Sequence, residues 1–250
     1  MKYVGSKNRI SKYIAPILQK CIDNNQSQVY IEPFVGGANM IDKIKCNIKI
    51  GLDIHKELIA LLTAVKLGYT PPNHISEEEY NQVRLHKEQY PDYYVGLVGF
   101  CATFGAKYFG GYARGFESDG VTPRDMSGEG IRNLMKQSPL LKDTYFHNMS
   151  YEEFNYKAMG QPLVIYCDIP YQNTTKYSTS SFDHNKFWNW ARTMSTDHFV
   201  FVSEYSAPED FISIWEKPVK VKLKPQLDTH ESRTEKLFVY KYGKYFEEGE

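Results

Sequence analysis

The chain has 250 residues, of which 42% are hydrophobic and 24% charged, and these values are typical of a globular protein and exclude a disordered tail. Thirty basic and thirty acidic side chains give a formal charge of zero, so total charge gives no support for a nucleic-acid partner. No apolar run approaches the roughly 20 residues that cross a bilayer, and the scattered cysteines and histidines exclude a disulfide framework and a zinc site. We expect a cytoplasmic protein without a metal.

The first third of the chain alternates between helical and strand patterns. Apolar residues at helical spacing predict a helix over 10–22, and short buried strands are predicted over 29–32 and 48–53. Another helix is expected to begin near Asn39, after a glycine pair, and a further amphipathic helix over 56–67. Strands and helices in alternation are typical of a parallel α/β sheet.

The alternation stops after Pro72 and resumes near residue 143. Residues 73–142 contain helical segments that are broken by a glycine-rich, aromatic stretch over 104–116. The later part predicts a strand, a helix, another strand and two antiparallel strands that close one edge of the sheet, over 163–167, 183–194, 199–202, 219–223 and 237–242. We expect an α/β core over 1–72 and 143–250, with 73–142 as a smaller, largely helical insertion.

A glycine turn follows the first predicted strand, and an acid closes the second. The segment Tyr30-Ile-Glu-Pro-Phe-Val-Gly-Gly-Ala-Asn39 lets a ligand approach the backbone closely at Gly36 and Gly37. Asp53 comes 17 residues after Gly36, where a carboxylate can accept hydrogen bonds from a ribose diol. A tight turn with Asp53 as a helix cap is the alternative, and any nucleoside cofactor fits this pattern.

The second chemical segment is Tyr166-Cys-Asp-Ile-Pro-Tyr171, at the end of a buried strand. Open α/β sheets bind their ligands at this carboxyl edge. Because Pro170 favours an extended conformation at Ile169, the Ile169 carbonyl can project beside the Asp168 carboxylate. Two acceptors next to the ring of Tyr171 suit a planar amine, which donates one N–H to each. The alternative is an ordinary turn led by an acid.

At this point the chain resembles the Dam-like DNA adenine-N6 methyltransferases of phages and bacteria, which use S-adenosylmethionine. Their usual tetrapeptide is Asp-Pro-Pro-Tyr, and Asp168-Ile-Pro-Tyr171 departs from it at a position whose backbone carbonyl is used. Their Phe-x-Gly-x-Gly motif corresponds to Phe34, Gly36 and Ala38, with alanine in place of the last glycine. The resemblance runs from Tyr3 to about Tyr242 and is weakest in the insertion.

The resemblance implies a Rossmann-like sheet and roles for individual residues. Asp168, Ile169, Pro170 and Tyr171 are implied to bind and activate the flipped adenine, with Asp168 also close to the cofactor. The residues implied to contact the cofactor are Tyr3, Lys7, Phe34, Gly36, Gly37, Asp53, Ser150 and Tyr151. The segments 201–205 and 233–237 resemble later core motifs. An exposed, helix-leading lysine is the alternative for Lys7.

Double-stranded DNA is the partner that the resemblance implies. The insertion holds aromatic and arginine side chains suited to phosphates or base edges, namely Tyr108, Tyr112, Arg114, Arg124 and Arg132. Residues 1–20 contain five basic and no acidic side chains, and residues 217–244 contain eight basic and three acidic ones. These local charges permit a polyanionic partner. The sequence leaves the recognition site, a companion restriction nuclease and the oligomeric state open, and a monomer is compatible with it.

Three other functions are compatible with parts of this pattern. A cytosine-N4 DNA methyltransferase usually has serine in place of Asp168, so adenine is favoured. A catalytically inactive DNA-binding relative should have lost Asp53 or Asp168, and both are present. A nicotinamide-dependent oxidoreductase should show Gly-x-Gly-x-x-Gly after the first strand, and the chain lacks this motif there.

Overall fold

The computed structural model describes residues 1–160, 162–171, 182–224 and 227–247, without the side chains at 220–232 and 247. The chain forms two compact units. Unit 1 comprises Met1–Ala15 and Val35–Phe154, and unit 2 comprises Pro16–Phe34 and Asn155–Glu250. These units do not coincide with the predicted core and insertion, whose division by function stays a prediction.

Unit 1 contains two parallel strands, β2 (Ile48–Asp53) and β3 (Thr144–Asn148). The predicted bounds of β2 are confirmed, whereas β3 was not predicted. The register pairs Asp53 with Asn148, so both strands end at the same level. The Asn148 side-chain amide donates to the Asp53 carbonyl over 2.9 Å, which fixes the two strand ends together.

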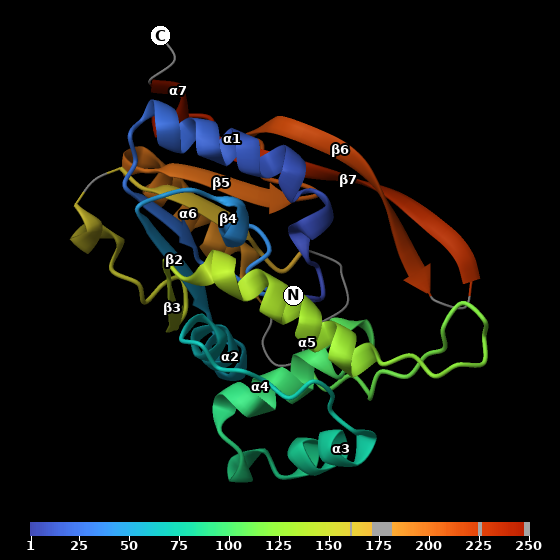
Figure 1. Cartoon of the computed structure of the whole chain (residues 1–250). Coiled ribbons are helices and arrows are strands. Elements are labelled where there is room, and N and C mark those ends of the chain that lie inside the picture. The colour runs from blue at the N-terminus through green and yellow to red at the C-terminus, as the bar shows by residue number, and fades with distance from the viewer. Residues whose placement is uncertain (161, 172–181, 225–226, 248–250) are drawn as a thin grey trace. The chain divides into compact units, whose positions relative to one another are not determined.

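Along the chain, some helices of unit 1 come before Pro72, the residue that precedes the predicted insertion, and others come after it. They are the 3₁₀ helix η1 (Lys7–Arg9), α2 (Lys56–Lys66), α3 (Glu77–Leu85), α4 (Asp92–Cys101) and α5 (Met126–Gln137), with short 3₁₀ turns η2 (Ile41–Lys43), η3 (Lys87–Gln89), η4 (Phe104–Ala106) and η5 (Ser138–Leu141). Figure 1 shows α3, α4 and α5 as separate rods joined by loops. α2 packs against α4 and β3, and Ser76 caps α3 through its hydroxyl. The largely helical character predicted for 73–142 agrees with these elements.

The segment after the glycine pair is not the predicted α-helix. Only the 3₁₀ turn η2 forms after Asn39, and the chain reaches β2 within a few residues. Met40, Ile41 and Ile44 are all buried, and their spacing fits a compact loop whose apolar side chains enter the core. Tertiary packing therefore outweighs the local helical pattern here.

Unit 2 contains a five-stranded mixed sheet in the order β1-β4-β5-β7-β6. β1, β4 and β5 are parallel neighbours, and β7 joins β5 in antiparallel orientation, followed by β6. Their bounds are β1 (Val29–Glu32), β4 (Val164–Asp168), β5 (Phe199–Glu204), β6 (Phe211–Lys224) and β7 (Leu227–Tyr240). Three parallel strands followed by an antiparallel edge, together with the parallel pair β2–β3 of unit 1, confirm the predicted α/β, Rossmann-like class.

The edge hairpin is much longer than predicted. β6 and β7 pair from Phe211 with Tyr240 as far as Lys224 with Leu227, interrupted by irregularities that include one between Ser213 and Trp215. β5 contacts only the start of this ribbon, because its pairs with β7 end at Glu204 and Lys236. Figure 1 shows the hairpin extending past β5.

The remaining elements of unit 2 pack on this sheet. α6 (His184–Asp197) packs on β5 and β7, and the Asp183 carboxylate caps its first turn. α7 (Lys244–Glu247) packs on β5, and the 3₁₀ turn η6 (Tyr156–Met159) precedes β4. α1 (Ser11–Asn24) begins in unit 1 and continues into unit 2, with Pro16 inside it.

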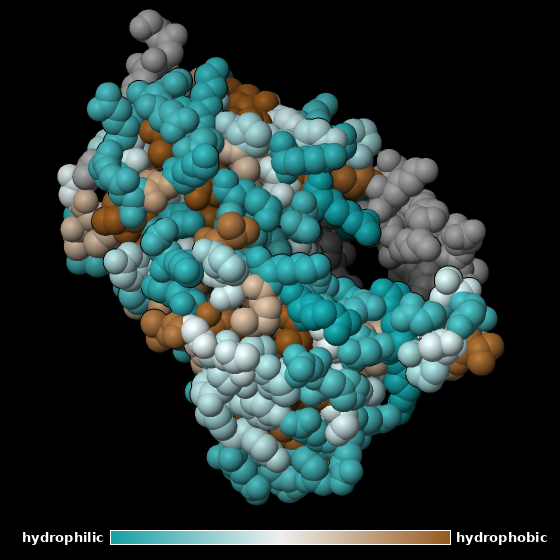
Figure 2. Space-filling view, viewed as in Figure 1, coloured by the Kyte–Doolittle hydropathy of each residue, from teal (hydrophilic) through white to brown (hydrophobic). Residues whose placement is uncertain are grey.

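The surface and the cysteines agree with an ordinary globular chain. On the face shown in Figure 2, hydrophilic side chains predominate and apolar ones are scattered in small groups. None of the four cysteines forms a disulfide, and Cys21, Cys101 and Cys167 are buried. No helix among the described residues is long and apolar enough to cross a membrane.

Candidate functional site

The glycine loop of unit 1 has a backbone that only small residues adopt readily. Gly36 has a φ of 47° and Ala38 a φ of 55°, both in the left-handed region. A Cβ atom on Gly36 would lie 2.9 Å from the Tyr3 ring, and one on Gly37 would lie 2.7 Å from the Tyr3 Cβ. Tyr3, Gly36 and Gly37, which the sequence predicted as cofactor contacts, therefore meet in one place.

Asp53 is held by backbone donors at the end of β2. Its Oδ2 accepts from the Gly36 N–H over 3.1 Å, and its Oδ1 accepts from the His55 N–H over 2.9 Å. Each carboxylate oxygen keeps a further lone pair for a ligand hydroxyl. Burial raises the pKa of Asp53, and the N–H groups of His55 and Gly36 oppose this rise. The arrangement is a fixed acceptor pair.

Ser150 and Tyr151 follow the end of β3, the strand paired with the Asp53 strand. The Met149 N–H donates to the Asp53 carbonyl over 3.2 Å, which brings this segment beside β2. The Ser150 N–H donates a hydrogen bond to the Glu153 carboxylate over 2.8 Å, and the Tyr151 side chain is buried. Ser150 and Tyr151 therefore follow a residue that is hydrogen-bonded to Asp53, the last residue of β2.

Two further predicted cofactor residues have different surroundings. Lys7 lies in η1 and is 9% exposed, which excludes the alternative of an exposed, helix-leading lysine. Phe34 belongs to unit 2, where its ring meets Phe182 and Phe187 edge-on at centroid distances of 5.7 and 5.8 Å. Contact of either residue with a cofactor stays a prediction.

A group of rings next to Asp53 was missed by the sequence analysis. His55 meets Phe100 and Tyr108 edge-on at 5.1 and 4.4 Å, and Tyr3 meets Phe100 at 5.6 Å. Burial lowers the pKa of His55 below its ordinary value, which favours the neutral ring. Tyr108, predicted to contact DNA, is thus half-buried beside His55. The sequence signal for this group was the position of His55, two residues after the acid that ends β2.

In unit 2 the predicted tetrapeptide begins at the last residue of β4. Asp168 pairs in register with Ser203 of β5 and is partly exposed, whereas the Ile169 side chain is 2% exposed. The Pro170 carbonyl accepts from His184 Nε2 over 2.9 Å. His184 begins α6, so this helix and β4 together fix the backbone that follows Asp168. No motif in the sequence pointed to His184.

Tyr171 is held from two sides. Its hydroxyl donates to the Glu235 carboxylate of β7, and its ring meets the Tyr205 ring edge-on at 4.6 Å. Burial, together with the nearby Asp168 and Glu235 carboxylates, raises the pKa of Tyr171 well above its ordinary value, so the phenol stays protonated as the donor. The four residues predicted to handle adenine thus lie together, with Tyr171 in a fixed orientation.

Buried acids surround this strand end. Glu32, the last residue of β1, is 2% exposed and accepts from the Tyr30 hydroxyl over 2.7 Å. Burial raises the pKa of the Cys167 thiol, and Glu32 and Asp168 add to the rise. The carboxyl ends of β1 and β4 therefore each carry an acidic side chain, Glu32 and Asp168. Glu32 lay inside the glycine segment that the sequence pointed to, but no role was predicted for it.

A cavity of about 590 Å³ opens beside Tyr205 in unit 2. The Arg233 guanidinium lies 5.2 Å from the centroid of the Tyr205 ring, at cation–π distance. The side chains lining the cavity combine hydroxyl, basic and acidic groups, namely Glu204, Tyr205, Ser206, Glu216, Arg233, Thr234 and Lys236. The segments 201–205 and 233–237, singled out from the sequence, contribute most of this lining.

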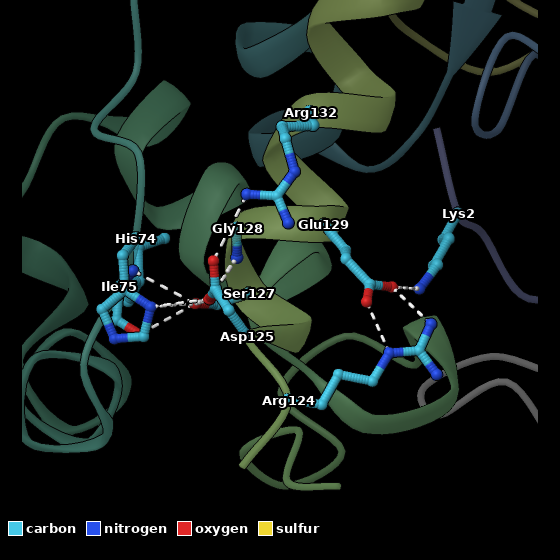
Figure 3. A network of polar contacts seen from close by, with 9 residues as sticks. All are labelled: Lys2, His74, Ile75, Arg124, Asp125, Ser127, Gly128, Glu129 and Arg132. Carbon is cyan, nitrogen blue, oxygen red and sulfur yellow. Dashed lines mark hydrogen bonds and ion pairs between the residues drawn. The ribbon is translucent and has the colours of Figure 1, made fainter. Parts of the chain in front are cut away.

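The three arginines predicted to contact DNA are exposed and paired with acids. Figure 3 shows Arg124 on Glu129, which also contacts Lys2, and Arg132 on Asp125. Arg114 pairs with Glu77 through two hydrogen bonds. The Arg124 guanidinium lowers the pKa of Glu129, so this partner stays ionised. Exposed pairs of this kind contribute about 0–1 kcal/mol each, so DNA phosphates can compete for the arginines.

Tyr112 and the loop beyond it have a mainly structural setting. The Tyr112 hydroxyl donates to the Ile75 carbonyl over 2.8 Å. Residues 116–123 form a small hairpin, in which Phe116 pairs with Pro123 and the Asp119 carboxylate accepts from the Val121 and Thr122 N–H groups. The hairpin leaves Phe116 and Val121 exposed, next to Arg114 and Arg124 in the chain.

The described residues include no group of three or more histidine, cysteine, aspartate or glutamate side chains that could hold a metal ion. Unit 1 holds one group of candidate residues, the glycine loop, Tyr3 and Asp53 with its two backbone donors. Unit 2 holds a second group, Asp168, Ile169, Pro170 and Tyr171.

Comparison with known families agrees with this chemistry. Residues 3–102 match the family model of the D12 class N6 adenine-specific DNA methyltransferases. No curated protein matches the chain. The matched segment contains the glycine loop, Asp53 and part of the predicted insertion. The match confirms the resemblance stated from the sequence, indicates an adenine-specific DNA methyltransferase, and supports the transfer of a methyl group from a donor to adenine N6 in DNA.

Proposed function

We propose that this adenine-specific DNA methyltransferase uses S-adenosylmethionine and acts on an adenine that is flipped out of duplex DNA. The observation that carries the proposal is the end of β4, where Asp168 precedes a backbone fixed by His184 and a ring fixed by Glu235. This arrangement suits an exocyclic amine, which needs two acceptors in its plane and a flat surface beside its ring.

The residues of unit 1 fit the nucleoside part of the cofactor. Asp53 has both carboxylate oxygens oriented by backbone N–H groups, so its remaining lone pairs can accept from the two ribose hydroxyls. Ser150 and Tyr151 lie beyond the paired strand end, where they can contact the adenine ring. Tyr3, Lys7, Phe34, Gly36 and Gly37 complete the proposed cofactor contacts. When bound, S-adenosylmethionine supplies an electrophilic methyl group whose leaving group is a neutral thioether.

Asp168 and Ile169 activate the target amine. The adenine amino nitrogen is a poor nucleophile because its lone pair is delocalised into the ring. Hydrogen bonds from its two N–H groups to the Asp168 carboxylate and the Ile169 carbonyl localise that lone pair on nitrogen. Holding the amine in line for displacement supplies much of the remaining acceleration.

Tyr171 compensates for part of the cost of flipping. Extrusion of a base costs a few kcal/mol, and stacking on an aromatic ring returns roughly 1–3 kcal/mol. The Glu235 hydrogen bond and the Tyr205 contact hold the Tyr171 ring in place before the base arrives. The cavity beside Tyr205, with Arg233 and Lys236 in its lining, suits the sugar and phosphate of the same nucleotide.

The insertion, residues 73–142, is proposed to recognise the DNA. Arg114, Arg124 and Arg132 exchange their acid partners for phosphates or base edges, and Tyr108 and Tyr112 contribute ring surface. The exposed apolar side chains of the 116–123 hairpin suit contact with base pairs opened by the flipped adenine. A monomer acting on one strand at a time is sufficient for this scheme.

Incubation with labelled S-adenosylmethionine and duplex DNA, followed by nucleoside analysis, tests the proposal. We expect label in N6-methyl-2′-deoxyadenosine and none in N4-methyl-2′-deoxycytidine. Label on cytosine instead would establish the cytosine-N4 alternative, and DNA binding without any methylation across varied sequences would indicate an inactive relative. Methylation-sensitive sequencing of DNA from cells that express the protein then gives the recognition site.

A further inference from the structure

Gln137, the last residue of α5, reaches the glycine loop of unit 1 with its side chain. It is 5% exposed, and its Nε2 lies 2.7 Å from the Ala38 carbonyl and 3.0 Å from Asp42 Oδ2. Longer contacts of 3.2 and 3.5 Å join the same nitrogen to the Gly37 carbonyl and to Asn39 Oδ1. Because an amide nitrogen has two hydrogens, the two short contacts are its principal bonds.

These bonds hold a loop that contains a strained residue. Ala38 has a φ of 55°, a conformation that costs a non-glycine residue about 1 kcal/mol and persists only where its surroundings enforce it. The Gln137 amide binds the carbonyl of this same residue. Two positions earlier, the Gly36 N–H donates to Asp53. The position of the donor for Asp53 therefore depends on a loop that Gln137 fixes.

α5 is a firm support for this contact. A Cβ on Gly130 would lie 2.3 Å from the Cys101 carbonyl, so α5 packs directly on the end of α4. The Ser127 hydroxyl bonds the Ile75 backbone, and Asp125 caps the first turn through the Gly128 N–H, as Figure 3 shows. Ser138, after Gln137, donates to the Val65 carbonyl over 2.9 Å. Both ends of the helix are thus anchored within unit 1.

From this geometry we propose that Gln137 is a positioning residue for cofactor binding, supplied by the end of the segment predicted to recognise DNA. It acts through the glycine loop and touches neither the cofactor nor the methylated base. The inference rests on the proposed use of S-adenosylmethionine. It also changes the predicted separation of functions between the insertion and the core. Residues 73–142 would then contribute both to DNA recognition and to the loop that binds the cofactor.

The test compares Gln137→Met with Lys136→Met. Both introduce the same side chain at neighbouring positions of α5, but Lys136 is exposed. Calorimetric titration with S-adenosylmethionine should show a dissociation constant raised roughly tenfold in Gln137→Met, because two hydrogen bonds to the loop are lost. Lys136→Met should bind like the wild type. At saturating cofactor and DNA, kcat of Gln137→Met should stay within about twofold of wild type.

A second variant keeps the test decisive if methionine destabilises the fold. Gln137→Glu retains the size and the Oε1 acceptor but replaces the donor with an oxygen that faces the Ala38 carbonyl and the Asp42 carboxylate. We expect it to bind the cofactor more weakly than Gln137→Met. Lowering the pH should narrow the difference in affinity between Gln137→Glu and the wild type measured at the same pH, because a protonated carboxyl group can donate again. The charged groups that face this side chain are the Asp42 carboxylate and the Met1 ammonium group, which contacts Oε1.

Hydrogen exchange without cofactor provides a readout independent of the proposed function. The amides of residues 36–39 should exchange faster in Gln137→Met than in the wild type and Lys136→Met, with the α5 amides unchanged. Failure of the wild type to bind S-adenosylmethionine would refute the proposed cofactor and leave this exchange comparison valid. Wild-type affinity together with wild-type exchange in folded Gln137→Met would overturn the positioning role.

Discussion

Asp53 and Asp168 each close a parallel strand, but their surroundings differ. Asp53 is clamped by two backbone N–H groups. Asp168 lies near Tyr166 and Tyr171. Burial is the main cause that raises the pKa of both tyrosines, and the nearby Asp168 carboxylate is the second. The first setting fixes an acceptor for neutral hydroxyls. The second places the Asp168 side chain beside an aromatic ring that Glu235 holds in place, which suits the N–H groups and the flat ring of an amine.

Replacing Asp53 with alanine should weaken cofactor binding more than it slows the bound enzyme. The variant loses a charged acceptor for the ribose hydroxyls, which is worth about 1.5–3 kcal/mol of binding free energy. Calorimetric titration with S-adenosylmethionine measures the change, and turnover at saturating cofactor gives the comparison. Unchanged affinity would assign Asp53 to the turn alone.

Cofactor affinity should also depend on pH through Asp53. Burial raises the folded-state pKa of this group above the ordinary 3.8, so protonation removes the acceptor at a higher pH than for an exposed aspartate. Affinity should therefore be full near neutrality and fall as the pH drops through the raised pKa. Asp53→Asn should bind weakly without this dependence. His55→Asn keeps the backbone donor and removes the neighbouring imidazole, so it should retain the decline at low pH.

Asp168→Ala should abolish methyl transfer, because one N–H of the target amine is left unpaired in a dry pocket. Single-turnover assays at saturating cofactor and DNA separate this loss from weakened binding. Ile169→Pro should stay close to wild-type rate, since the second acceptor is a backbone carbonyl. The buried Ile169 side chain adds a stability loss of about 1 kcal/mol that thermal unfolding should detect. A near wild-type rate in Asp168→Ala would show that Asp168 is not catalytic and that the tetrapeptide only forms a turn.

At the scale of elements, strands with continuous apolar runs were predictable and polar ones were not. β1 and β2 have the predicted bounds because buried runs end at an acid followed by a turn. The hairpin of β6 and β7 was underestimated because its outer part alternates lysine with other residues and pairs only with itself. β3 was missed because Thr144–Asn148 is mostly exposed and carries no apolar run.

The candidate site divides in the same way. Gly36 and Asp53 were predictable from their spacing because the strand and its turn are local features of the chain. The bond from Tyr171 to Glu235 joins positions 64 residues apart and exists because β7 returns beside β5. Likewise, the bond from Gln137 to the glycine loop depends on where α5 ends. Long-range pairings of this kind have no signal in a single sequence.

The arginines of the insertion give a prediction at this scale. Arg114→Ala should weaken DNA binding and lower the slope of log affinity against log salt by about 1, as expected for one lost phosphate contact. Cofactor affinity should not change. Glu77→Gln removes the partner of Arg114 and should change DNA affinity in the opposite direction. Tyr112→Phe, which loses a hydrogen bond to Ile75, serves as a structural control. An unchanged salt slope in Arg114→Ala would place this arginine outside the interface.

For the whole molecule, the binding free energy of the cofactor should appear as stability against unfolding. A ligand that binds only the folded chain at 100 times its dissociation constant stabilises it by about 2.7 kcal/mol. In a chain of 250 residues this raises the thermal midpoint by roughly 5–10 °C. Asp53→Ala at the same cofactor concentration should gain about half of that free energy or less, because its affinity is at least about tenfold lower. Lys136→Met should show the full shift, and Gln137→Met a reduced one. Thermal scans at several cofactor concentrations measure these shifts, and an equal shift in Asp53→Ala and wild type would show that the cofactor binds without the β2 carboxylate.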